Sequence, residues 1–100
     1  MANYTETIYK AINKGYSTYL ENENGGTILY PSENQQLIEL TMLQKWLRDS
    51  YKIFVIIELS ASIHYFKPVI ESEQKYRELE KVNNYELALL EGINEALQLI

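Results

Sequence analysis

The clearest hydrophobic pattern lies in residues 83–100. Apolar side chains recur there at steps of three or four positions, the period of one helical face: Tyr85, Leu89, Ile93, Ala96 and Ile100. Asn83 and Glu86 have the spacing of a capping box, in which each side chain bonds a backbone N–H of the first turn. The pattern predicts a closing C-terminal amphipathic helix that packs by one face.

A similar pattern at the other end predicts a helix over residues 4–14. Asn3 and Glu6 again have capping-box spacing, and a helical apolar face follows them. Residues 16–20 and 27–30 are short β-prone runs around a segment rich in Asn and Gly. Because Asn and Gly tolerate the positive φ of tight turns, these two runs predict a hairpin.

A third helix is predicted over residues 41–50. Thr41 and Gln44 have capping-box spacing, and the apolar face consists of Leu40, Leu43, Trp46 and Leu47. Extending this face backward places Gln36 and Glu39 on the apolar side and Ile38 on the solvent side, so the helical pattern breaks near Thr41. Residues 32–40 are therefore left open as a linker, a strand or a frayed helix.

Residues 51–59 alternate in the manner of a β-strand. One side is wholly apolar, with Tyr51, Ile53, Val55, Ile57 and Leu59. The other side is apolar at its centre, at Phe54 and Ile56, where a sheet with one solvated face would not need apolar residues. We expect a second layer, such as the N-terminal helix, or another protein molecule to cover that side.

Residues 63–70 predict the returning antiparallel strand. Pro68 cannot donate a ladder hydrogen bond, so this strand is expected at an edge or to end near Pro68. The spacing of apolar residues in 71–82 favours a helical turn, with a short polar edge strand as the alternative. The whole chain, 1–100, is thus predicted to be a single α+β domain, with helices packed on a small antiparallel sheet.

Charge and composition narrow the function. The net charge of −5 opposes a phosphate backbone, so nucleic acid is an unlikely partner. No apolar run approaches the roughly 20 residues of a membrane helix, and the start lacks the features of a secretory signal. With no cysteine in the chain, we expect a cytoplasmic protein without membrane contact.

Catalytic and metal-binding motifs are not evident. His64 is the only histidine, and no second His or Cys is available to share a metal ion. Neither Ser60 nor Ser62 lies in a nucleophile elbow, and Gly25-Gly26 lacks the residues of a phosphate-binding loop. The chain is therefore expected to be no enzyme and to bind no cofactor or metal.

Two stretches resemble a known pattern. They are Gln44-Lys45-Trp46-Leu47-Arg48-Asp49 with the strand after it, and Tyr85-Glu86-Leu87-Ala88-Leu89 continuing to Ile100. The chain resembles small uncharacterised proteins of phage and prophage origin in Bacteroidetes, which carry a "QKWLR" helix and a closing "YEEAL…EAL" helix. The resemblance covers residues 41–59 and 83–100 and implies an α+β fold in a mobile-element setting. Leu87 departs from it, standing where the pattern has a second Glu.

The leading functional hypothesis is a non-enzymatic protein-interaction module or phage accessory factor, and homodimerisation through the same surface is its plain version. Its motivation is the doubly apolar strand and a tyrosine-rich composition, nine tyrosines against two phenylalanines. The candidate interaction surface is Phe54, Ile56, Tyr65 and Leu87.

Two alternatives stay open. One is a nucleic-acid-binding domain that uses Lys45, Arg48 and Lys52 beside Trp46. The other is an acidic nucleic-acid mimic whose carboxylates gather on one surface, namely Glu71, Glu73, Glu78 and Glu80.

Overall fold

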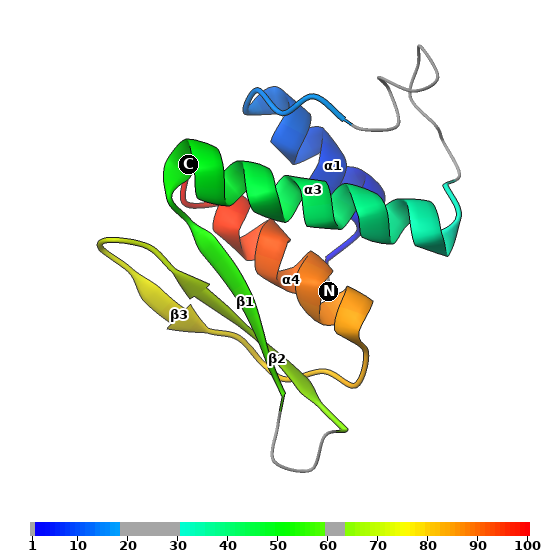
Figure 1. Ribbon diagram of the computed structural model, residues 1–100, viewed down its shortest axis with the longest axis vertical. Coiled ribbons are helices and arrows are strands. Elements are labelled where there is room, and N and C mark those ends of the chain that lie inside the picture. Colours follow the sequence, from blue (N-terminus) through cyan, green and yellow to red (C-terminus); the bar gives the residue numbers. More distant parts are fainter. Residues whose placement is uncertain (1, 19–30, 60–63) are drawn as a thin grey trace.

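The computed structural model describes residues 2–18, 31–59 and 64–100. In chain order the elements are α1 (Tyr4–Asn13), α3 (Glu33–Tyr51), β1 (Phe54–Leu59), β2 (Phe66–Glu71), β3 (Tyr76–Glu78) and α4 (Tyr85–Leu97). The strands form one antiparallel sheet in the order β1-β2-β3, and α4 lies between that sheet and helices α1 and α3 (Figure 1). The predicted α+β class is confirmed. The predicted hairpin falls largely on residues 19–30, outside the described residues.

One part of the core lies where α4 meets the sheet, and much of the rest is formed by α1 and α3. Val55 of β1, Ile70 of β2 and Ile93 of α4 are buried in the first part. A Cβ atom on Gly92 would lie 2.7 Å from Val55 Cγ1 and 3.3 Å from Pro68 Cβ. A helix interior normally favours alanine over glycine. The glycine is explained here by the close approach of β1 and β2 to this position of α4.

Helix α3 is longer than predicted, because residues 32–40 belong to it. Ser32 Oγ accepts a hydrogen bond from the Gln35 N–H at 3.2 Å, and Gln35 Oε1 accepts one from the Ser32 N–H at 2.8 Å. This is the real capping box of the helix. Glu39, which interrupted the apolar face in the sequence, is buried and accepts a hydrogen bond from the Tyr16 hydroxyl. The hydrogen-bond donor to Glu39 comes from Tyr16, far away in the sequence. The apolar pattern of residues 32–40 is therefore interrupted at Glu39 although the helix continues.

Strand β1 begins three residues later than predicted, because α3 continues through Tyr51. Lys52 then adopts a left-handed φ of 57°, and its N–H and that of Ile53 bond carbonyls of the last helical turn. The core side of the predicted strand is confirmed at Ile53 and Val55, which are buried. Leu59, at the far end, is exposed.

Strand β2 is the central strand, so the expected edge position of Pro68 is wrong. The Leu79 N–H donates to the Pro68 carbonyl at 2.9 Å, one residue beyond the end of β3. The missing N–H of Pro68 therefore coincides with the end of the β2–β3 ladder. Within residues 71–82, β3 is a short edge strand, so the edge-strand alternative is right and the helical one is wrong.

The two terminal helices lie close to their predicted positions. Asn3 Oδ1 accepts a hydrogen bond from the Glu6 N–H at 3.1 Å, as the spacing in α1 predicts. The cap of α4 is Asn84, whose Oδ1 accepts from the Leu87 N–H at 2.8 Å, one residue later than predicted. Helix α4 ends at Leu97 and not at the last residue.

Candidate interaction surfaces

The face of the sheet turned away from α4 is called here the outer face. It carries alternate residues of the three strands: Phe54, Ile56 and Glu58; Lys67, Val69 and Glu71; and Tyr76 and Glu78. Successive side chains of a strand point to opposite faces, and Val55 points at α4. The outer face therefore takes no part in the core between the sheet and α4.

Apolar side chains occupy the middle of the outer face. Phe54 and Ile56 are 42% and 41% exposed, whereas Val69 beside them is only 3% exposed. Helix α1 packs against α4 at the opposite end of the molecule from the sheet (Figure 1). The expectation that the N-terminal helix covers this side is therefore wrong. Among the described residues, none buries Phe54 and Ile56.

Charged side chains surround this apolar centre. Lys67 Nζ lies 2.8 Å from Glu78 Oε1 and 3.9 Å from Glu58 Oε1. The hydrogen bond from Lys67 lowers the pKa of the Glu78 carboxyl below its usual value. Together with Glu71, the outer face carries three carboxylates and one ammonium, a net charge of −2 at neutral pH. Charge complementarity would favour a positively charged partner here.

The four predicted interaction residues do not form one surface. Phe54 and Ile56 are neighbours on the outer face. Tyr65 is exposed just before β2, with Lys81 Nζ 5.7 Å from its ring centroid. Leu87 is half-buried on α4, among the helices. The exposed tyrosines of the described residues are also dispersed, over α1, α3, the segment before β2, β3 and α4: Tyr9, Tyr51, Tyr65, Tyr76 and Tyr85.

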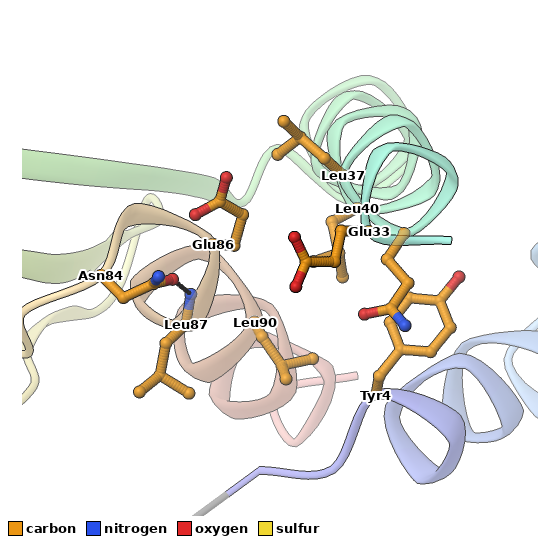
Figure 2. A pocket seen from close by; sticks show the side chains of 9 residues that line it. Tyr4, Glu33, Leu37, Leu40, Asn84, Glu86, Leu87 and Leu90 are labelled. Atoms are coloured by element: carbon orange, nitrogen blue, oxygen red, sulfur yellow. Dashed lines mark hydrogen bonds between the residues drawn. The ribbon is translucent and has the colours of Figure 1, made fainter. Parts of the chain in front are cut away.

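A second surface is a cavity of about 440 Å³ between the N-terminal halves of α3 and α4 and the start of α1, called here the helical groove (Figure 2). Its apolar lining consists of Tyr4, Leu37, Leu40, Leu87 and Leu90. Glu33 of α3 and Glu86 of α4 lie on facing sides of it. Burial raises the pKa of Tyr4, and the charge of the nearby Glu39 raises it further.

The predicted basic cluster is partly neutralised. Lys45 Nζ lies 2.7 Å from Asp49 Oδ2, and Arg48 Nε lies 3.5 Å from Asp49 Oδ1. These contacts, that with Lys45 foremost, lower the pKa of the Asp49 carboxyl. Trp46 is half-buried between two tyrosine rings, at centroid distances of 5.4 and 5.3 Å. The indole ring therefore packs within the protein beside this cluster.

The four carboxylates considered for mimicry occupy different parts of the sheet. Glu71 and Glu78 share the outer face, where Glu78 is paired with Lys67. Glu73 lies between β2 and β3, and Glu80 follows β3.

A buried polar pair escaped prediction. The Tyr16 hydroxyl donates to Glu39 Oε2 at 2.8 Å, and both side chains are buried. Burial raises the pKa of Tyr16, and the hydrogen bond to Glu39 raises it further. The only signal in the sequence was a carboxylate on the apolar side of a helix. The pair ties the segment after α1 to α3.

Two further searches of residues 2–18, 31–59 and 64–100 gave negative results. No three His, Asp or Glu side chains there are grouped so that they could hold a metal ion. No helix in the same ranges is long and apolar enough to cross a membrane. His64 is exposed.

The fold and these surfaces define a class, a small α+β domain with a groove between helices and a sheet face that no described residue covers. Comparison of the chain with models of known protein families, with curated proteins and with solved structures gave no significant match. The functional argument therefore depends on the chain's own residues.

Proposed function

We propose that this chain is a non-enzymatic protein-interaction module, a phage or prophage accessory factor, and that its outer face docks a partner protein. The observation that carries this is the pair Phe54 and Ile56, side by side and about two-fifths exposed on a strand whose opposite side is buried at Val55. Covering what remains exposed of each side chain would contribute about 1 kcal/mol. Such a gain alone supports only a weak complex, so Tyr76 and the charged rim must add to it.

Charge favours a partner other than a second copy. Two outer faces placed against each other would bring together two surfaces of net charge −2. Each close pair of like charges in water costs about 1 kcal/mol at 4 Å, as much as one of the apolar contacts contributes. A partner whose rim carries lysine or arginine gains this energy instead. Homodimerisation through the same face is the second version of the proposal.

The nucleic-acid alternative has less support. Asp49 offsets part of the charge of Lys45 and Arg48, and the net charge of −5 opposes phosphate at longer range. The acidic-mimic alternative needs unpaired carboxylates, and Glu78 is held by Lys67.

The proposal is tested by affinity capture with matched variants. The tagged protein, a Phe54→Thr/Ile56→Thr variant and a Tyr9→Ala control would each be exposed to a nuclease-treated Bacteroidetes lysate. Threonine keeps the β-propensity of the strand, and Tyr9 is an equally exposed aromatic residue on α1. We expect one retained protein, lost in the double variant and kept in the control. Equal recovery by all three would contradict the outer face as the docking surface.

The homodimeric version is tested separately by light scattering across a range of protein concentrations. A monomer at high concentration is the expected result. If the protein is instead a dimer, and the Phe54→Thr/Ile56→Thr variant is a monomer, the outer face would bind a second copy of the chain and not a different partner.

A further inference from the structure

The helical groove combines an apolar interior with charged sides. Leu40 is almost fully buried, and Leu37 and Leu90 line the groove from α3 and α4. Its volume of about 440 Å³ is in the range of roughly 300–1,000 Å³ that is typical of ligand sites in proteins. The groove can therefore accept large apolar side chains from outside.

The charge of the groove has one sign. Glu33 and Glu86 come from different helices and lie on facing sides, and none of the described residues that line the groove is a lysine or arginine (Figure 2). Neither carboxylate makes an ion pair within the described part of the chain. Each lies in the first turn of its helix, where the helix dipole contributes about half a unit of positive charge. The positive end of each helix dipole offsets part of the charge of its glutamate, so the groove keeps a net negative charge.

These features decide between classes of ligand. Helix N-termini bind anions readily, but here Glu33 and Glu86 occupy those positions and would repel an anion. Besides the two carboxylates, a bare metal ion would find only the neutral polar side chains of Tyr4, Gln36 and Asn84, and among the described residues no three His, Asp or Glu are grouped to hold it. A ligand with an apolar group next to a cation can contact the leucines inside the groove and pair its charge with Glu33 and Glu86.

We propose that the helical groove binds a segment of a partner protein that presents a large apolar side chain beside a lysine or arginine. The apolar side chain enters between Leu37 and Leu90, above Leu40, and the cation lies between Glu33 and Glu86. This inference does not depend on the outer face, which lies on the sheet and shares no residue with the groove.

The test is a titration of the isotope-labelled protein, followed by its backbone amide NMR signals. The probe is a short amphipathic peptide of leucine and lysine. One control peptide replaces lysine with glutamate, and another replaces leucine with serine. We expect saturable shifts at groove residues such as Glu33, Leu37 and Leu87, seen with the first peptide only.

A matched pair of variants separates local from overall charge. Glu33→Gln/Glu86→Gln and Glu73→Gln/Glu80→Gln both change the net charge from −5 to −3, and only the first alters the groove. Loss of one exposed ion pair weakens binding about threefold, so the groove variant should bind about tenfold more weakly and the control within about twofold of the wild type. Signal dispersion shows that each variant is folded. Shifts centred elsewhere, no saturable binding, or an equal loss in both variants would overturn the proposal.

Discussion

Replacing Gly92 with alanine tests how closely α4 is seated on the sheet. The substitution removes a helix-interior glycine, which by itself would stabilise the helix by about 1 kcal/mol. The new Cβ, however, would lie 2.7 Å from Val55 Cγ1, closer than carbon atoms can approach. Val55 is buried and β-branched, so its side chain cannot turn away freely. Overpacking of this kind costs about 1–3 kcal/mol, so after the gain in the helix we expect a net loss of up to about 2 kcal/mol.

The same reasoning predicts an interaction between two positions. In a Val55→Ala background the obstructing Cγ1 is absent, so Gly92→Ala should stabilise the protein by up to about 1 kcal/mol. Urea denaturation of the four proteins in this cycle gives each free energy of unfolding, with the m-value as a check on two-state behaviour. A Gly92→Ala variant as stable as the wild type, with no coupling to Val55→Ala, would refute the described contact between α4 and β1.

Three further predictions concern the core and the buried tyrosines. Val55→Asp and Ile93→Asp each bury an unpaired charge. We expect each to lower the free energy of unfolding by more than about 4 kcal/mol and to abolish the cooperative thermal transition. An unchanged Tm would contradict the proposed packing. Tyr16→Phe removes a hydrogen bond to Glu39 and should cost about 1–3 kcal/mol in urea denaturation, whereas a cost near zero would contradict the pair. The pKa values of Tyr4 and Tyr16 are raised above the ordinary 10.0. The folded state therefore favours the protonated form of each tyrosine. The free energy of unfolding keeps this contribution below pH 10 and loses it above pH 10, by up to about 1.4 kcal/mol per pH unit for each tyrosine. Tyr16→Phe should make the loss of stability with rising pH less steep, and an unchanged slope would argue against the shift at Tyr16.

Local signals predicted the ends of the fold better than its middle. The spacing of Asn3 and Glu6 located α1 because a helix cap is a contact between neighbours in sequence. Alternation placed Ile53 and Val55 in the core because side chains of a strand alternate whatever the partner strand is. Both features depend on a few consecutive residues, so the sequence contains all the information they need.

The errors arose where distant residues decide the outcome. Glu39 kept the predicted helix from extending back beyond residue 41. In the structure Tyr16 donates a hydrogen bond to Glu39, so the carboxylate is buried within α3. Pro68 was assigned to an edge because the end of β3 beside it could not be foreseen. Gly92 gave no signal by itself, since its role depends on the approach of Val55.

The candidate site was predicted in part. Phe54 and Ile56 stood out because apolar residues on both sides of a strand conflict with a solvated face, and the structure places them together. Leu87 proved to belong to the helical groove, because membership of a surface depends on how three helices meet. Glu33 and Glu86 were missed as a pair for the same reason, lying on different helices.

The most direct test of the interaction proposal is site-specific photo-cross-linking. A benzophenone amino acid would replace Phe54 in one protein and Tyr9 in another, and both would be irradiated in nuclease-treated extract. Both positions are exposed aromatics, but only Phe54 lies on the outer face. We predict one cross-linked partner from position 54 that does not appear from position 9 and is displaced by excess unlabelled protein. No product specific to position 54 would contradict the account.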